Sequence, residues 1–296
     1  MLDFRIETFL MVCQYMNYTR AAEALNITQP AVSQHIRYLE EEYHAKLFLQ
    51  EGKRIQLTEE GELFWQTALR IQHDVLHLKK EINQRKGKRK KLCFGATFTI
   101  GEHIVPEYLP NLLKQSKELS IELRLGNTAD LLQGLCSGEL EFVIVEGNFI
   151  KQEYSYELYK KEPFIAVCAA GHSFQREPGL LEKLLPETLI VREKDSGNRE
   201  ILERALQEKN LGLSDFSSCI EVNNIQAMKE LIKRDMGIGF LYYAAVKQEI
   251  EEGSIKEIKL LDFQVEHNMS FVWMKGSVFE EYYKKCAKLL RPKNKK

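Results

Sequence analysis

The sequence predicts an α/β protein in which a short, mostly helical N-terminal unit and one long helix precede a larger domain of two lobes. Three stretches with different patterns support this order. Residues 1–58 fit short helices and a hairpin, residues 59–86 fit one long helix, and residues 92–296 alternate strands with helices. Strands that alternate with helices form βαβ units, so we expect sheets with a large parallel component.

A basic run separates the long helix from the larger domain. Six of the seven residues in 85–91 are Arg or Lys, and the seventh is Gly87. Such a composition cannot form a core, which predicts an exposed hinge at residues 87–91. The run can also attract the DNA backbone, and the sequence leaves both interpretations open.

Length and composition allow more than one hydrophobic core, since 44% of the 296 residues are hydrophobic and 29% are charged. The formal net charge of -1 gives no overall basicity, so a nucleic-acid partner must be identified from local features. The six cysteines form no CxxC pair and no Cys/His cluster at zinc-ligand spacing, which predicts reduced thiols and no metal site. The N-terminus lacks a signal-peptide pattern, and the longest uncharged apolar run, 237–246, is too short to span a bilayer. We therefore expect a cytoplasmic protein that does not contact a membrane.

The segment 18–43, YTRAAEALNITQPAVSQHIRYLEEEY, predicts two helices joined by a tight turn. Asn17 or Thr19 can cap the first helix, and Thr28 can cap the second, with Pro30 in its first turn. The apolar spacing of the second helix predicts that one stripe is buried. That stripe consists of Val32, Ile36, Leu39 and Tyr43.

The opposite face of the second helix presents side chains suited to the major groove of DNA. Gln pairs with adenine, Ser adapts to base edges or phosphate, and Arg binds guanine or phosphate. A predicted hairpin follows, with Leu47-Phe48 and residues 55–57 on either side of a Glu51-Gly52 turn, and its tip carries two cations like a DNA-binding wing. The alternative is a solvated polar face on an ordinary helical hairpin. The candidate DNA-binding residues are Thr28, Gln29, Pro30, Ser33, Gln34, Arg37, Lys53 and Arg54.

The N-terminal sequence FLMVCQYMNYTRAAEALNITQPAVSQHIRYLEEEYHAKLF…LTEEG resembles the signature of the LysR-type transcriptional regulators. The resemblance implies a winged helix-turn-helix that binds an interrupted palindromic promoter site in double-stranded DNA. One departure concerns the wing, because Leu49-Gln50 stands where the family usually has an arginine. Arg54 is the residue that could take over that contact.

The long helix, residues 59–86, carries apolar residues at alternating spacings of four and three, which is a heptad seam. A helix of about 28 residues is roughly 42 Å long, and a second copy of the chain is expected to cover its seam. Near its start, Trp65 and Leu69 are expected to pack within the chain instead. His73 and His77 lie one turn apart, and we interpret them as an exposed pair without a metal. The candidate dimerisation residues are Phe64, Ala68, Ile71, Val75, Leu78 and Ile82.

Seven β-rich runs follow the hinge, at 92–96, 121–125, 142–145, 164–169, 188–191, 237–241 and 269–274. This half also resembles the LysR family in three stretches, LCFGATFTIG (92–101), ELEFVIV (139–145) and MGIGFL (236–241). The resemblance implies two Rossmann-like lobes, similar to those of type 2 periplasmic binding proteins, with an effector in the cleft between them. Lobe I would combine 92–162 with 266–296, and lobe II would be 163–265. Family members also suggest a homodimer that pairs into a homotetramer.

Hydroxyl and amide side chains follow the predicted strands and precede helices. Backbone N–H groups at helix N-termini, placed at the carboxyl ends of strands, form a site for a small anion. Each of these residues could instead serve only as a helix cap. The candidate effector-binding residues are Thr97, Thr99, Thr128, Gly147, Ser196, Asn198 and Arg199.

Three classes of protein compete for this pattern: a regulator, a transported solute-binding protein and an enzyme. A transported binding protein needs a signal peptide and has no helix-turn-helix, whereas this sequence has the reverse pattern. The sequence contains no GxSxG, Walker A or HExxH motif, so we predict no catalytic residues and no enzymatic activity. Cys219 could act as a redox switch, but no resolving cysteine lies near it in the sequence. The sequence therefore predicts a LysR-type regulator that responds to a small anionic metabolite and needs no cofactor.

Overall fold

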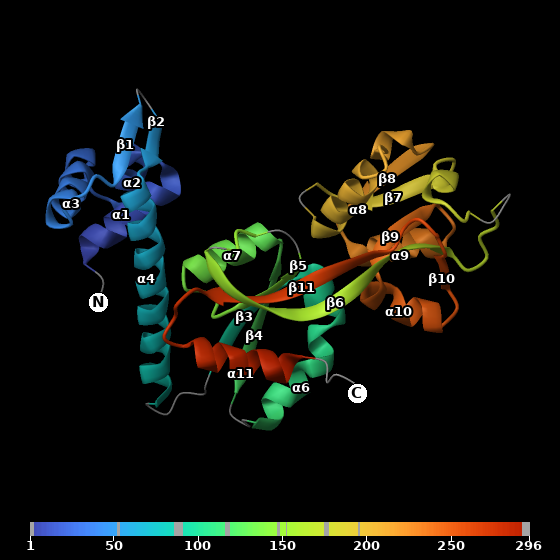
Figure 1. Cartoon of the computed structure of the whole chain (residues 1–296). Helices are drawn as coiled ribbons and strands as arrows, with labels where there is room; N and C mark the ends of the chain where they lie inside the picture. The colour runs from blue at the N-terminus through green and yellow to red at the C-terminus, as the bar shows by residue number, and fades with distance from the viewer. Residues whose placement is uncertain are drawn as a thin grey trace.

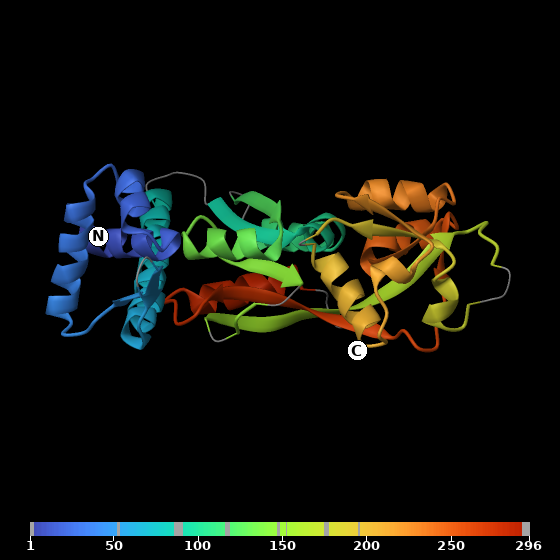
Figure 2. The same cartoon turned by 90° about the horizontal axis from the view of Figure 1, so that it is seen from above.

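The computed structural model describes residues 3–51, 54–85, 91–115, 119–146, 149–151, 153–174, 178–194 and 196–291. The chain forms three parts in a row: an N-terminal unit, a first α/β lobe and a second α/β lobe (Figure 2). The helix α4 (Glu59–Arg85) runs along the side of the first lobe and carries the N-terminal unit at one end (Figure 1).

The N-terminal unit has the predicted order of short helices and hairpin. The Asn17 side chain caps α2 by accepting hydrogen bonds from the N–H groups of Thr19 and Arg20 at 2.9 and 3.0 Å. Thr28 caps α3 in the same way, accepting from the N–H of Ala31 at 3.3 Å. The elements of the N-terminal unit are α1 (Phe4–Tyr15), α2 (Tyr18–Leu25), α3 (Gln29–Glu42), β1 (Phe48–Glu51) and β2 (Arg54–Leu57).

The buried stripe of α3 is one residue shorter than the sequence predicts. Val32, Ile36 and Leu39 are buried in the core of the unit, but Tyr43 is 52% exposed. Tyr43 is the residue at which α3 ends, so it no longer follows the helical face, and its ring contacts Phe64 edge-on at 4.9 Å. The spacing rule fails there because the helix stops.

His73 and His77 on α4 are buried, which corrects the expectation of an exposed pair. Lobe I of the same chain packs over this face of α4, and sequence spacing could not show that. The Nε2 atom of His73 lies 3.2 Å from the carbonyl oxygen of Leu140. His77 Nδ1 lies 3.1 Å from the Tyr283 hydroxyl, and its ring stacks on Phe279 at 3.9 Å. In the part of the chain that the structure describes, no three His, Cys, Asp or Glu side chains could hold a metal ion.

Both lobes are built on short parallel sheets that share two long strands. In lobe I, β3 pairs in parallel with β4 and β5, and in lobe II, β7 pairs in parallel with β8 and β9. The strand order over the described residues is β4-β3-β5-β11-β6-β9-β7-β8, with β10 paired to β6. The strands are β3 (Lys91–Thr97), β4 (Ser120–Gly126), β5 (Val143–Glu146), β6 (Tyr154–Ala169), β7 (Thr188–Arg192), β8 (Ser218–Val222), β9 (Ile238–Tyr242), β10 (Ile255–Ile258) and β11 (Val265–Met274).

The antiparallel strands β6 and β11 cross from one lobe to the other (Figure 1). One end of β11 pairs with β5 of lobe I, and one end of β6 pairs with β9 of lobe II. The predicted lobe boundaries at 162/163 and 265/266 fall within these strands or at their start. The helices of the two lobes are α5 (Phe98–His103), α6 (Val105–Gln115), α7 (Thr128–Cys136), α8 (Gly197–Gln207), α9 (Ile225–Lys233), α10 (Tyr243–Glu251) and α11 (Glu280–Leu290), with 3-10 turns at Leu181–Leu184 and Leu213–Asp215.

The largest apolar core extends through both lobes, and each lobe has a smaller core of its own. In lobe I, the ring of Phe142 stacks between those of Phe94 and Phe271 at 4.9 and 4.4 Å. In lobe II, Phe240 packs against Phe263 at 5.0 Å. Among the described residues, no helix is both long enough and apolar enough to cross a membrane.

Candidate functional site

A cavity of about 210 Å³ lies where the two lobes meet, at the carboxyl ends of β3, β4, β5 and β7. Polar side chains from both lobes line it. Five of the seven predicted effector-binding residues line this cavity: Thr97, Thr99, Thr128, Ser196 and Asn198. The two parallel sheets therefore bring to one place side chains that lie up to about a hundred positions apart in the sequence.

The helices α7 of lobe I and α8 of lobe II begin at this cavity, as does the six-residue α5 of lobe I. The Asn127 side chain caps α7 by accepting from the N–H of Asp130 at 2.8 Å. Ser196 precedes α8, but its hydroxyl makes no capping hydrogen bond. Asn198 is 4% exposed, and its Nδ2 amide has no hydrogen-bond partner among the described residues. Buried donors without a partner are rare, so this amide marks a place for an acceptor on a ligand.

Glu146 is the residue of the cavity that sequence reasoning missed. It ends β5, is 4% exposed, and accepts a hydrogen bond from the Thr97 hydroxyl through Oε2. Its carbonyl oxygen accepts from the Thr128 hydroxyl at 3.1 Å. Burial raises the pKa of Glu146 to about 7, although Thr97 and the charge of Arg192 act in the opposite direction. The signal in the sequence is a carboxyl group directly after an apolar strand. The sequence prediction names the next residue, Gly147, which lies outside the described residues.

Arg192 supplies a buried cation at the lobe II side of the cavity, and it too was missed. Its side chain is 4% exposed and donates to the carboxylate of Glu193 at 2.7 and 2.9 Å. Arg199, predicted as a ligand contact, does not line the cavity. Its guanidinium donates to Glu203 and Glu221 at 2.7 and 2.6 Å, so its donors are directed to lobe II itself.

The predicted DNA-contacting side chains share one exposed surface at the start of α3. Gln29 and Ser33 are joined by a hydrogen bond of 2.9 Å. They line a hollow of about 480 Å³ that Arg37 and Lys46 also border. Lys46 was not predicted, because it lies in the connection between α3 and the hairpin. Thr28, Gln29, Pro30, Gln34 and Arg37 are exposed, and Ser33 is half-buried.

The hairpin β1–β2 forms the predicted wing. Its strands pair antiparallel, with Glu51 opposite Arg54. Arg54 is exposed at the start of β2. Lys53, the other predicted cation, lies outside the described residues.

The heptad seam of α4 divides into two parts. Phe64 and Ala68 pack into the core of the N-terminal unit, whereas Ile71, Leu78 and Ile82 are 42%, 47% and 48% exposed. Val75 is half-buried. Because His73 and His77 turn the other face of α4 toward lobe I, the exposed apolar residues face away from the chain's own core. Such a surface on a long helix suits a second helix.

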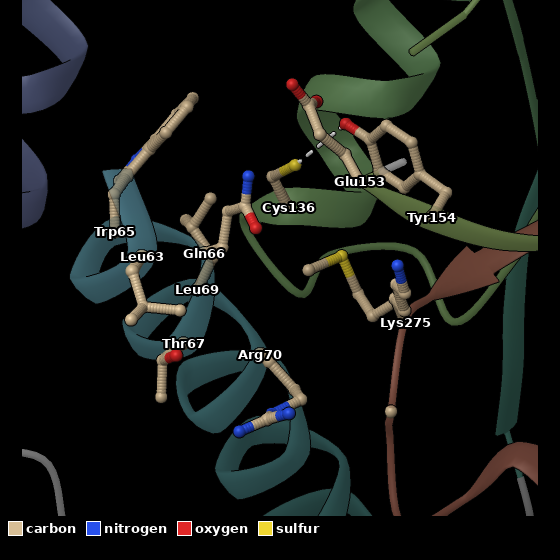
Figure 3. Close-up of a pocket in the computed structure, with 12 residues that line it drawn as sticks. Leu63, Trp65, Gln66, Thr67, Leu69, Arg70, Cys136, Glu153, Tyr154 and Lys275 are labelled. Carbon is tan, nitrogen blue, oxygen red and sulfur yellow. Dashed lines mark hydrogen bonds between the residues drawn. The ribbon is translucent and has the colours of Figure 1, made fainter. Parts of the chain in front are cut away.

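A second cavity, of about 340 Å³, lies between α4 and the end of lobe I that is remote from the cleft. Figure 3 shows Trp65, Leu69 and Arg70 of α4 on one side and Cys136 and Tyr154 on the other. The Cys136 thiol lies 3.3 Å from the Tyr154 hydroxyl, and burial raises the pKa of that thiol. This cavity lies at the junction between the N-terminal part and lobe I.

The thiol of Cys219, on β8, also has a pKa raised by burial, which disfavours a reactive thiolate there.

Comparison with known proteins gives the same organisation. The family model described as LysR substrate binding domain matches residues 85–294. The model for the bacterial regulatory helix-turn-helix protein, lysR family, matches residues 5–62. The two models together match both the N-terminal unit and the two lobes.

Similar proteins include the HTH-type transcriptional regulator CysL of Bacillus subtilis, 28% identical over 90% of this chain and 89% of that protein. The solved full-length LysG of Corynebacterium glutamicum, with bound effector Arg, has a TM-score of 0.63 at 16% identity and covers 99% of this chain and 100% of that one. The regulatory domain of Synechocystis PCC6803 CcmR, in complex with 2-PG, has a TM-score of 0.61 at 16% identity and covers 69% of this chain and 99% of that one.

The fold and the two sites define a DNA-binding regulator with a ligand-sensing domain. The chain belongs to the LysR family of bacterial transcriptional regulators. Members of this family bind DNA through the helix-turn-helix, form oligomers and bind small effectors. The family and the fold class predicted from the sequence are therefore confirmed.

Proposed function

We propose that this regulator binds a small anionic metabolite between its two lobes and that the bound metabolite changes how the protein engages DNA. The observation that carries the proposal is the buried Asn198 amide, which has no partner and lies at the start of α8 in the cavity. At about 210 Å³, the cavity is below the roughly 300–1,000 Å³ of drug-sized ligand sites, which suits a small metabolite.

The sign of the ligand's charge follows from the donors around the cavity. The N-termini of α7 and α8 carry partial positive charge and free N–H groups, both of which favour an anion. Arg192 adds a full positive charge, which Glu193 partly neutralises. The proposed contacts are Thr97, Thr99, Thr128, Ser196 and Asn198, with Glu146 and Arg192 at the two walls. Gly147 remains a proposed contact because of its place in the sequence. Arg199 is no longer a proposed contact, and we propose that it holds α8 in place instead.

Two solved structures of similar proteins agree with a small-molecule effector. LysG holds Arg and CcmR holds 2-PG, so related two-lobed domains accept small charged molecules of different kinds. We propose that this chain binds a small effector and has no resident cofactor. We also propose that the protein acts in the cytoplasm and has no catalytic activity.

For the DNA-binding end, we propose that the start of α3 enters the major groove, with Gln29 and Ser33 at base edges. Arg37 and Arg54 would contact phosphates or the minor groove. Two chains would pair through Ile71, Val75, Leu78 and Ile82 of α4 and so place two α3 helices on an interrupted palindrome. Dimers would then pair into tetramers.

The connection between effector and DNA is proposed to run through lobe I. The helix α4 is fixed to lobe I by hydrogen bonds along its length, so the N-terminal unit follows that lobe. A ligand that contacts both lobes changes their relative angle only if it binds one arrangement more tightly. Lobe II would then move relative to lobe I and α4, and the oligomer would transmit this to the spacing of its DNA-binding units.

The experiment separates sensing from DNA binding. Ser196→Ala and Asn198→Ala should weaken the response of the DNA footprint to the effector, because each removes about 1 kcal/mol or more of ligand hydrogen bonding. Operator affinity without effector should stay within a few-fold of wild type. Weakened operator binding without effector would instead assign these residues a purely structural role, and an unaltered response would place the effector elsewhere.

A further inference from the structure

The carboxyl group of Glu146 lies in the cleft in which we propose that an anion binds. It belongs to lobe I, yet it contacts the start of α8 in lobe II. A Cβ atom added to Gly197 would lie 3.6 Å from Cγ of Glu146 and 3.4 Å from its carbonyl oxygen. Gly197 and Asn198 therefore bring the α8 N-terminus, where an anion is favoured, directly against an acidic side chain of this chain.

The cations near Glu146 do not cancel its charge. Arg192 attracts it, but the guanidinium is held in two hydrogen bonds by Glu193. The Thr97 hydroxyl donates a hydrogen bond to this carboxyl group, and a hydrogen bond with Thr99 also acts to lower its pKa. The charged and titratable groups near it are Arg192 on β7, Glu193 and Lys194 after β7, and Tyr242 on β9. Tyr242 in turn lies near Glu162 on β6, Glu200 on α8 and its partner His267 on β11.

A second anion in this cavity would meet Glu146 at close range. Two negative groups in one water-poor site cannot both stay charged without a large penalty, and one of them takes up a proton. Burial already raises the pKa of Glu146 to about 7, so this carboxyl group accepts the proton at little cost near neutral pH. A protonated carboxyl group is also a hydrogen-bond donor, whereas a carboxylate only accepts.

We propose that Glu146 is the specificity-determining residue of the cleft, which binds the anionic effector as a neutral carboxylic acid, so that effector binding takes up one proton. This proposal rests on the anion site proposed above. It also defines the class of effector. An anion whose bound end offers acceptors to both Asn198 and Glu146 fits the cleft, whereas a molecule that directs an ammonium group at Glu146 would keep it ionised and take up no proton.

Sulfate is a suitable probe, because it is an anion that does not titrate near neutral pH. Binding of sulfate to the full chain is measured by calorimetry in chloride buffers between about pH 6 and about pH 8.5. If only the protonated form of Glu146 binds, affinity falls about 30-fold over this range, and the slope approaches tenfold per pH unit well above pH 7. Titration in two buffers with different heats of ionisation at about pH 8 counts the protons, and we expect about one per sulfate.

Two variants assign the proton. In Glu146→Gln the amide is a donor at every pH, so sulfate affinity should become independent of pH. Glu208→Gln is the matched control, since it removes an exposed carboxylate at the end of α8 opposite to the cleft and should keep the wild-type dependence. The proton count on the wild-type chain stands on its own should Glu146→Gln fail to fold.

The outcomes separate this proposal from the one on which it rests. Asn198→Ala should weaken sulfate binding at every pH, which places the ion in the cleft. If Asn198→Ala leaves binding unchanged at about pH 6, the anion site itself is wrong, and this proposal falls with it. If Asn198→Ala weakens binding but the wild-type chain takes up no proton and shows no pH dependence, the anion site stands and the role of Glu146 is overturned.

Discussion

The carboxylate of Asp74 on α4 accepts a hydrogen bond from the hydroxyl of Ser277 in lobe I, with 2.5 Å between the two oxygen atoms. Its second oxygen accepts from the N–H of Val278 at 3.2 Å. Further along the helix, Lys80 donates to the carbonyl oxygens of Gly138 and Glu139. These contacts join α4 to lobe I of the same chain.

Asp74→Ala should loosen this docking and leave both parts folded. The loss of two hydrogen bonds to a partly buried carboxylate should cost about 1–3 kcal/mol of unfolding free energy. Burial raises the pKa of Asp74, but hydrogen bonds from His73, Ser277 and Val278 outweigh it and hold the pKa below its ordinary value. A lowered pKa stabilises the fold above the unfolded-state value, and this contribution disappears as the pH falls through the folded-state value.

Urea unfolding of wild type and Asp74→Ala over a range of pH checks this prediction. The difference between them should be present at neutral pH and shrink below about pH 4. Lys79→Ala, at an exposed position of the same helix, serves as the control and should change stability little. Equal stability of wild type and Asp74→Ala at neutral pH would mean that the bonds to Ser277 and Val278 do not hold α4 in place.

Ile71→Asp or Leu78→Asp should split the dimer. Both side chains are more than 40% exposed on the face of α4 turned away from lobe I, where a carboxylate would have to lose its water on pairing. Leu261→Asp is the control, since Leu261 is 80% exposed but lies in lobe II, far along the chain from the seam. Sedimentation should show monomers for the two α4 variants only, and intact oligomers in all three variants would refute pairing through α4.

Gln29→Ala should relax base preference without abolishing DNA binding. Gln29 is exposed at the start of α3, and its amide is oriented by Ser33 at 2.9 Å. Loss of one good base contact should cost about 1–3 kcal/mol on the preferred site and little on other sites. Binding-site selection with both proteins measures this effect, and identical selected sequences would move the recognition face away from Gln29.

Arg54→Ala should weaken binding to all DNA sequences by a similar factor. Arg54 is exposed at the start of β2, where we propose that it contacts the backbone or minor groove. One phosphate contact contributes about 0.9 to the slope of log affinity against log salt concentration, and the variant should lose that amount. An unchanged salt slope with altered base preference would instead make Arg54 a base-reading residue.

Local signals in the sequence predicted the parts of the fold that depend on neighbours in the chain. Asn17 and Thr28 cap the helices that they were expected to cap, because capping needs only the two or three residues that follow. The strands β8 and β10 were not predicted. Both are short: β8 (SCIEV) has no buried residue, and in β10 (IKEI) the two buried isoleucines are separated by Lys256 and Glu257. Such strands lack a continuous apolar run.

Contacts between parts far apart in the sequence could not be predicted. Glu146 is buried only because lobe II closes over the end of β5, and His73 and His77 are buried only because lobe I packs on α4. The sequence could predict that the hydroxyls of the cleft lie close together, because the carboxyl ends of parallel strands meet at one edge of a sheet. It could not show that an acidic side chain shares that cavity or that Arg199 turns away from it.

The small molecules that stay bound to the protein during purification test the central claim most directly. Wild type and Asn198→Ala are purified side by side as full chains and denatured, and the released compounds are identified by mass spectrometry. We expect one small anion to recur with wild type and to be reduced about tenfold in the variant, since one lost hydrogen bond of that kind costs about 1.4 kcal/mol. The same compounds in the same amounts from both proteins would contradict an anionic effector held between the lobes.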